Sequence, residues 1–456
     1  MMMSHPGIYC REPIVQKQPT SEFAAPWVLG TSPGMTSGND MPSLTRFLPP
    51  AFAKPRFRIF AAGQAVSVLG SWIQQVALAW LVYRLTDSVF LLGLTGFLLQ
   101  IPHLFIAPVA GFMIDRLPRV RALIAINAVL GCLAALLAVL VLAGVTQIWP
   151  YLTVALLIGI GNACESPARQ SLLGAIVEER GLLPSAIGFN SVLFNAGRMI
   201  GPAIAGVLLS SFSEGVCFTL NALSFIGIIG ALVAMRLDDK AAVTAKPTTQ
   251  GAVRASLERL WGLPVARYLL PSASAVAFFA LPLNQLMPSI AVDFFKGDPR
   301  TVGLLLSASG VGALTGALFL SMQTSHRAQL RLVQIGPLVA GLALFAFSFS
   351  RSLWLSLPLL AIMGAFVLST SVSTNTLLQQ SVEDSWRGRV IGLYFTFFLG
   401  MAPLGNLLAG SLASHIGLGK TLALNGLMMA AAAIIAQLRL RTDPAVYGRL
   451  KESVRL

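Results

Sequence analysis

The chain has 456 residues, of which 55% are hydrophobic and 11% are charged, and its formal net charge is +14. A soluble globular protein carries roughly 25% charged residues, so this composition excludes an ordinary soluble protein and indicates a lipid environment. The Lys and Arg residues lie in short clusters between long apolar runs, which argues against a nucleic-acid partner. The four cysteines are scattered without a CxxC pair, so we expect neither a disulfide framework nor a metal site.

Residues 1–50 are rich in Pro, Ser, Gly and Thr and show no helical period. They also lack the basic and then apolar layout of a signal peptide. We predict a disordered cytoplasmic tail, and Met41 is an alternative natural start because the ordered pattern begins just after it.

Long runs without Asp, Glu, Lys or Arg follow one another from Ile59 onward, apart from one arginine at Arg198. A bilayer core about 30 Å thick needs roughly 20 helical residues. One run is twice that length and has a turn-like break at Gly144–Gln147, so we predict twelve membrane-spanning helices. The runs are Ile59–Tyr83, Ser88–Ile114, Ala122–Cys164, Gly181–Ser213, Gly215–Met235, Tyr268–Val292, Thr301–Ser325, Leu332–Ser350, Ser352–Val382, Val390–Ser414 and Thr421–Leu438.

The basic residues predict the orientation of these helices. With the N-terminus inside the cell, most Lys and Arg lie in cytoplasmic loops, as the positive-inside rule requires. The exceptions outside are Arg84, Lys296, Arg300, Arg351 and Lys420. We therefore predict an all-α membrane protein with both termini in the cytoplasm.

We expect two six-helix bundles, residues 55–236 and 268–440, followed by a cytoplasmic tail at 441–456. The linker at 237–267 contains Val253–Trp261, which forms either an amphipathic helix on the membrane surface or a solvated linker helix. A weak repeat supports two related halves: Leu172, Leu173, Val177 and Ile187-Gly188 recur as Leu377, Leu378, Val382 and Ile391-Gly392. Parallel halves of this kind are typical of alternating-access transporters.

The loop between the second and third predicted helices carries the pattern G-x-x-x-D-R-x-x-R. Its residues are Gly111, Asp115, Arg116, Arg119 and Arg121. An ordinary basic loop needs no such spacing, and the pattern resembles motif A of the major facilitator superfamily. That resemblance implies a role in gating the cytoplasmic side of a transporter.

A second pattern lies in the fifth predicted helix and contains Gly197, Gly201, Pro202 and Gly206. It is similar to motif C of the same superfamily, which is associated with exporters that exchange substrate for protons. Ala205 replaces one glycine of that motif. Small residues at this spacing also allow close helix packing, which is the alternative interpretation.

The first half resembles more closely the branch that contains enterobactin exporters and macrolide efflux pumps, although the loop at 316–331 has lost most of motif A. The residues that carry this resemblance are Gly63, Gln64, Gly70, Ser71, Trp72, Gln75, Pro167, Ala168, Arg169 and Gln170.

Charged side chains within the spans are further candidates, because a charge at the bilayer centre costs about 2.5–3.5 kcal/mol. Glu165 lies four residues before Arg169, which suits an ion pair on one face of a helix. We consider two roles for Glu165, Arg169 and Arg198: coupling transport to protons, or a structural ion-pair network between helices 2, 4 and 5. His103 is expected to be hydrogen-bonded, with a proton relay as the alternative.

The resemblance also implies that helices 1, 4, 7 and 10 line a central cavity. Their polar residues are the binding candidates: Gln74, Gln75, Asn162, Asn284, Gln285 and Asn375. The sequence Gly417-Leu-Gly419-Lys420-Thr421 is similar to the end of a phosphate-binding loop. It has Ser414 at the first glycine position and no preceding strand, so ATP binding is not expected.

We therefore predict a secondary transporter of the bacterial inner membrane that exports small amphiphilic molecules by proton antiport. We expect no enzymatic activity and no cofactor, and the partners are the substrate, protons and the lipid bilayer around a monomer. Two alternatives remain open: an importer of a nutrient or lipid with the same fold, and a transporter-like membrane sensor.

Overall fold

The computed structural model describes residues 49–114, 117–177, 179–236, 264–322, 325–382 and 384–442. All regular elements within these ranges are helices, and twelve segments are long and apolar enough to cross a membrane. The predicted number of spans is therefore confirmed. Three predicted segments lie outside the described residues, apart from positions 49–50 and 441–442. They are the tails at 1–50 and 441–456 and the amphipathic segment Val253–Trp261.

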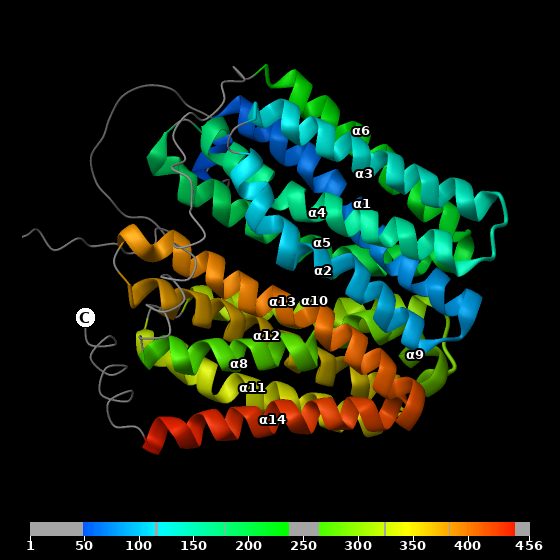
Figure 1. Cartoon of the computed structure of the whole chain (residues 1–456), viewed down its shortest axis with the longest axis vertical. Coiled ribbons are helices and arrows are strands. Elements are labelled where there is room, and N and C mark those ends of the chain that lie inside the picture. Colours follow the sequence, from blue (N-terminus) through cyan, green and yellow to red (C-terminus); the bar gives the residue numbers. More distant parts are fainter. Residues whose placement is uncertain are drawn as a thin grey trace, which may run out of the picture. The chain divides into compact units, whose positions relative to one another are not determined.

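Six long helices form the first bundle (Figure 1). They are preceded by the short 3-10 helix η2 (Pro50–Ala53), and a second one, η3 (Arg180–Leu182), precedes the fifth long helix. The six are α1 (Pro55–Thr86), α2 (Val89–Ile114), α3 (Arg119–Leu142), α4 (Ile148–Val177), α5 (Leu183–Ser211) and α6 (Glu214–Ala234).

The second bundle also has six spans, but its first span consists of two helices. The predicted run Tyr268–Val292 is interrupted at Leu281, where Pro282 begins a new helix. Proline lacks the N–H that would continue the helix and restricts the residue before it, so the break follows from the sequence. The helices are α8 (Pro264–Ala280), α9 (Pro282–Phe295), α10 (Pro299–Ser321), α11 (His326–Phe349), α12 (Leu353–Gln380), α13 (Asp384–Ile416) and α14 (Leu418–Thr442).

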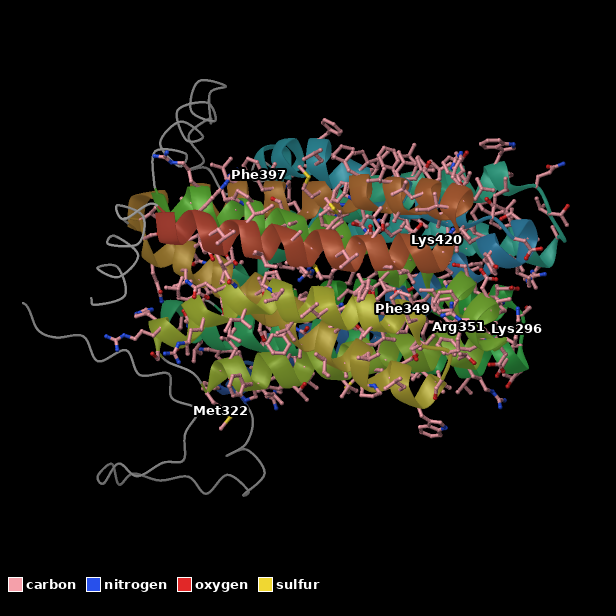
Figure 2. The ribbon with its side chains drawn as sticks, turned by 90° about the horizontal axis from the view of Figure 1, so that it is seen from below. Lys296, Met322, Phe349, Arg351, Phe397 and Lys420 are labelled. Atoms are coloured by element: carbon pink, nitrogen blue, oxygen red, sulfur yellow. The ribbon has the colours of Figure 1, made fainter. Side chains whose placement is uncertain are left out.

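The helices run back and forth between two ends of the molecule. We call the end at which α1 begins the proximal end, and the end at which α1 finishes at Thr86 the distal end. Figure 2 shows Lys296, Arg351 and Lys420 at the distal end, and Met322 near the proximal end. These three basic residues are among those that the sequence places outside the cytoplasm.

Two helix pairs join the bundles, α5 with α10 and α2 with α13. Glycines at their crossings bring the backbones together. A Cβ atom at Gly303 of α10 would lie 2.6 Å from the Pro202 carbonyl oxygen, and one at Gly93 of α2 would lie 2.8 Å from the Gly410 Cα. Such small residues are how membrane helices achieve close packing.

Polar contacts also join the bundles at the distal end. The Tyr83 hydroxyl of α1 donates a hydrogen bond of 3.0 Å to the Asp293 carboxylate of α9. The Arg300 Nε atom of α10 donates to the Ser210 hydroxyl of α5 at 2.7 Å. The two bundles are thus in direct contact at this end.

The proximal half of α5 is less covered than its distal half. Gly188 and Ser191 continue, at helical spacing, the face on which Met199, Pro202 and Gly206 meet α10. Both are nevertheless exposed, and a Cβ atom at Gly188 would meet nothing within 4 Å. Helices α5 and α10 therefore touch from the middle to the distal end and diverge toward the proximal end.

Candidate functional site

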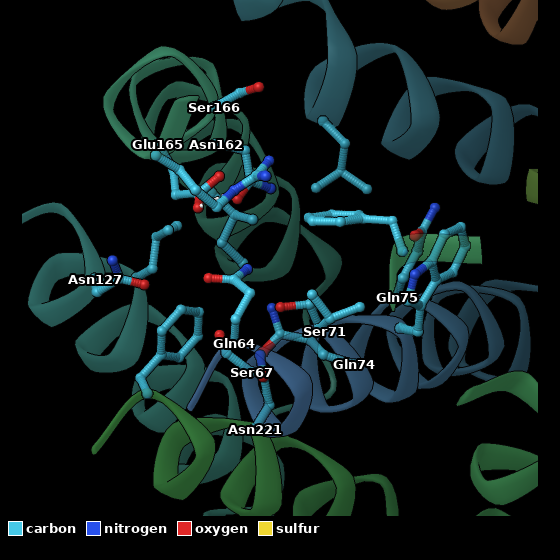
Figure 3. Close-up of a pocket in the computed structure, with 18 of the residues that line it drawn as sticks. Gln64, Ser67, Ser71, Gln74, Gln75, Asn127, Asn162, Glu165, Ser166 and Asn221 are labelled. Carbon is cyan, nitrogen blue, oxygen red and sulfur yellow. Dashed lines mark hydrogen bonds and ion pairs between the residues drawn. The ribbon is translucent and has the colours of Figure 1, made fainter. Parts of the chain in front are cut away.

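A cavity of about 350 Å³ lies inside the first bundle, and all six of its helices contribute to the wall. Figure 3 shows the polar side chains that gather around it, mainly from α1 and α4. Its polar lining consists of Gln64, Ser67, Ser71, Gln74, Gln75, Gln100, His103, Asn127, Asn162, Glu165, Ser166, Arg169 and Asn221. A wall with this many uncharged donors and acceptors suits a small molecule that carries polar groups on an apolar body.

The polar residues of α1 form one stripe because Gln64, Ser67, Ser71 and Gln74 are spaced by three or four residues. The Asn221 side chain of α6 donates a hydrogen bond of 2.8 Å to the Gln74 side chain. The Ser224 hydroxyl in turn donates to Asn221 at 3.0 Å. Gln74 was predicted as a lining residue, whereas Ser67, Asn127 and Asn221 were not. The spacing of three or four residues along α1 could have indicated Ser67.

Glu165 and Arg169 form the predicted ion pair on α4. The Arg169 Nε atom lies 2.9 Å from the Glu165 carboxylate, and the side chains are 7% and 18% exposed, respectively. Arg169 also donates a hydrogen bond of 3.2 Å to Asn190, and its guanidinium lies 4.4 Å from the centre of the Phe194 ring. Asn190 and Phe194 belong to α5, so the pair connects α4 with α5 at the cavity wall.

Arg198 takes no part in this pair. It has no ion-pair or hydrogen-bond partner among the described residues, and it lies one helical turn beyond Phe194 on α5. Arg198 is therefore not part of the ion pair within the described chain, and its role in proton coupling stays a prediction. The spacing of four residues predicts only the pair of Glu165 and Arg169 within one helix. The surroundings of Arg198 could not be predicted in this way, because they depend on how α5 packs against its neighbours.

The residues of motif C pack against two different helices. Cβ atoms at Gly197 and Gly201 would each lie 2.5 Å from side-chain atoms of α1, those of Val68 and Trp72. A Cβ atom at Gly206 would lie 2.8 Å from the Pro299 carbonyl oxygen at the start of α10. The glycines of motif C thus allow α5 to pack closely against α1 of its own bundle and against α10 of the second bundle.

Part of the motif A pattern is visible. Gly111 lies in the last turn of α2, and Arg119 and Arg121 lie in the first turn of α3 at the proximal end. Arg121 is exposed and has a partner, while the Arg119 Nε atom is buried and has no hydrogen bond among the described residues. Asp115 and Arg116 lie outside the described residues, so the gating role stays a prediction.

The six predicted cavity residues fall into two groups. Gln74, Gln75 and Asn162 line the cavity together. Asn284, Gln285 and Asn375 do not, because this cavity lies within the first bundle rather than between the two halves. Asn375 accepts a hydrogen bond of 3.2 Å from Gln379 on its own helix, and the buried Gln285 has no partner for its Nε2 atom in the described part of the chain.

Two further residues that the sequence singled out have clear positions. His103 lines the cavity from α2, and its Nδ1 atom is buried. Its hydrogen bonding and the alternative role as a proton relay stay predictions. Gly417 has a φ of 89° in the turn between α13 and α14, at the distal end. That segment is a tight helix connection, in which glycine adopts the left-handed conformation at little cost.

Comparison with known proteins identifies the family. The family model described as "Transmembrane secretion effector" matches residues 47–447, which is most of the chain. The chain belongs to this family of the major facilitator superfamily. It is therefore an efflux-type membrane transporter and not an enzyme, and its family accounts for the twelve helices in two bundles.

The names of three curated relatives indicate different substrates. Macrolide efflux protein A of Streptococcus pyogenes is 25% identical over 84% of this chain and 95% of its own length. The staphyloferrin A transporter of Staphylococcus aureus is 23% identical, with 81% and 92% covered. The multidrug efflux pump Tap of Mycolicibacterium fortuitum is 26% identical, with 80% and 91% covered.

Solved structures share the fold at low identity. A bacterial homologue of the human lysosomal transporter Spinster, in an inward-facing and occupied conformation, has a TM-score of 0.66 and 15% identity. The match covers 86% of this chain and 97% of the other. This similarity shows the fold alone.

Proposed function

We propose that this protein exports small amphiphilic molecules across the bacterial inner membrane, in exchange for protons and as a monomer. The observation that carries the proposal is the polar cavity inside the first bundle, which contains an acid paired with an arginine. The names of the relatives support macrolides, siderophores and other drugs as substrate classes.

Alternating access supplies the mechanism. The bundles meet at the distal end through Tyr83 and Asp293 and diverge along the proximal half of α5. If the proximal end faces the cytoplasm, as the basic loops predict, this arrangement is open to the inside and ready to accept a molecule for export. Rocking of the two bundles, residues 55–236 and 268–440, would then break the distal contacts and release the substrate outside.

Glu165 is the group that we assign to proton coupling. Its carboxylate is mostly buried, lies on the cavity wall and is paired with Arg169 at 2.9 Å. Protonation would remove the negative charge and weaken that pair, and Arg169 would then be held only by Asn190 and Phe194 of α5. A proton can therefore change how α4 and α5 are connected, which links protonation to the shape of the cavity.

Inside-out membrane vesicles provide the test. A proton gradient is imposed and followed with a pH-sensitive dye while macrolides, siderophores and cationic dyes are added. We expect a substrate to collapse the gradient in the presence of the wild-type protein and the Asp87→Asn variant, whose exposed acid lies outside the cavity. Glu165→Gln should abolish this response but leave binding of the substrate to the purified protein within about threefold of wild type.

The results separate this proposal from its alternatives. A Glu165→Gln variant that still dissipates the gradient would remove Glu165 from the coupling step. Substrate uptake in the opposite direction would identify an importer. Binding without transport by the purified protein in proteoliposomes would favour a membrane sensor.

A further inference from the structure

Arg198 lies near the middle of the membrane layer. It is 15 residues after Leu183 and 13 residues before Ser211, the two ends of α5. At 1.5 Å per residue, it is about 20 Å from either end of the helix. An arginine at this depth is far from the headgroup region, so its side chain cannot reach either surface easily.

The positive charge of Arg198 is not neutralised by the described protein. The carboxylate of Glu165 already pairs with Arg169 at 2.9 Å. Two further acids are engaged at the distal end, where Glu214 pairs with Arg84 and Asp293 accepts from Tyr83. An uncompensated intramembrane cation is costly and faces a cavity or a partner.

The contacts of α5 show which way Arg198 faces. Phe194, one turn earlier on the same face, lines the cavity, and Pro202, one turn later, meets α10 of the second bundle. Helical side chains lean toward the N-terminus of their helix, which here is the proximal end. From this geometry we infer that the guanidinium is directed to the side on which α5 and α10 diverge, and Arg198 has intermediate exposure.

We propose that Arg198 binds an anionic group of the transported molecule, so that the protein prefers amphiphiles carrying a carboxylate. The inference rests on the proposed export function and specifies its substrate class. Guanidinium and carboxylate form paired, charge-assisted hydrogen bonds. A carboxylate that enters from the proximal side would supply the counter-ion that Arg198 does not find among the described residues, while the apolar body lies against Phe194 and Trp72.

Three matched probes test this inference: a dansyl-labelled medium-chain carboxylic acid, its primary amide and the corresponding quaternary ammonium compound. Binding is measured by fluorescence to the purified full chain in phosphatidylcholine nanodiscs, which requires no transport. We expect the wild type to bind the carboxylate about tenfold or more tightly than the amide. Arg198→Gln should remove this preference, and Arg198→Lys should retain part of it.

The control is Arg331→Gln, which removes an exposed positive charge from α11 outside the cavity and should leave all three affinities unchanged. Three results would each overturn the inference. The wild type binds the acid and the amide with equal affinity, it does not bind the carboxylate, or Arg198→Gln loses affinity equally for all three probes. Loss of the preference in nanodiscs of phosphatidylglycerol would assign Arg198 to a lipid phosphate instead. Gradient collapse by macrolides or cationic dyes in the vesicle test would leave export intact even when the carboxylate inference fails.

Discussion

The pair of Glu165 and Arg169 allows the structural part of their role to be measured separately from transport. Arg169→Gln would leave the Glu165 carboxylate mostly buried without its cation, and breaking a buried pair costs about 3 kcal/mol. We expect this variant to unfold at a clearly lower temperature in detergent, followed by intrinsic fluorescence. The double variant with Glu165→Gln should recover part of the loss, and a double variant no more stable than Arg169→Gln would contradict a stabilising pair.

Tyr83 offers a second test at the residue scale. Tyr83→Phe removes the hydrogen bond to Asp293 that joins the bundles, which is worth about 1 kcal/mol or roughly fivefold in a conformational equilibrium. We expect a larger population with the distal end open, detected by double electron–electron resonance between spin labels at Phe212 and Lys296. Tyr151→Phe is the matched control, because the Tyr151 hydroxyl donates to the Val145 carbonyl within the first bundle.

Tyr151→Phe should lower stability without changing the distance distribution. If Tyr83→Phe also leaves that distribution unchanged, the hydrogen bond has no part in closing the distal end.

At the scale of single helices, close glycine contacts set the distance between α5 and α10. An alanine Cβ atom at Gly303 would lie 2.6 Å from the Pro202 carbonyl oxygen, which belongs to the backbone and cannot rotate away. We expect Gly303→Ala to separate the two helices and to shift the same spin-label distances toward the open distal state. Gly227→Ala on α6 is the control, because its Cβ atom meets nothing within 4 Å.

Gly227→Ala should keep the wild-type distribution of spin-label distances. It should also be slightly more stable, because alanine has a higher helix propensity than glycine. Reduced stability of Gly303→Ala with unchanged distances would mean that the contact only holds the fold together.

The elements also show what the sequence could and could not predict. Apolar runs set the twelve spans because each helix must satisfy its own backbone hydrogen bonds in lipid. The pair of Glu165 and Arg169 was predictable because it depends on the spacing within one helix. The hydrogen bond from Asn221 to Gln74 was not, since it depends on how α6 packs against α1, 147 positions apart. Asn284, Gln285 and Asn375 were predicted to line a central cavity between the halves. Because the cavity described here lies within the first bundle, their role stays a prediction.

At the scale of the whole molecule, the contacts between the bundles differ in strength from those within them. Arg84 pairs with the buried Glu214 inside the first bundle, whereas the bundles meet through glycine crossings and single hydrogen bonds such as that of Arg300 with Ser210. An interface of glycine crossings and single hydrogen bonds can be broken and re-formed without unfolding either bundle. This distribution of contacts fits two rigid bodies that move against each other.

The direction of transport then depends on which end faces the cytoplasm, and the basic loops predict that it is the proximal end. Single cysteines test this topology after the native cysteines are replaced. One replaces Met322, which is 81% exposed near the proximal end, and the other replaces Thr146 in the exposed distal loop between α3 and α4. In spheroplasts, a membrane-impermeant maleimide should label the cysteine at Thr146 and spare the one at Met322, which should react only after the membrane is permeabilised. The reverse pattern would place the open side of the bundles outside the cell, and the same closed distal contacts would then belong to a transporter poised for uptake.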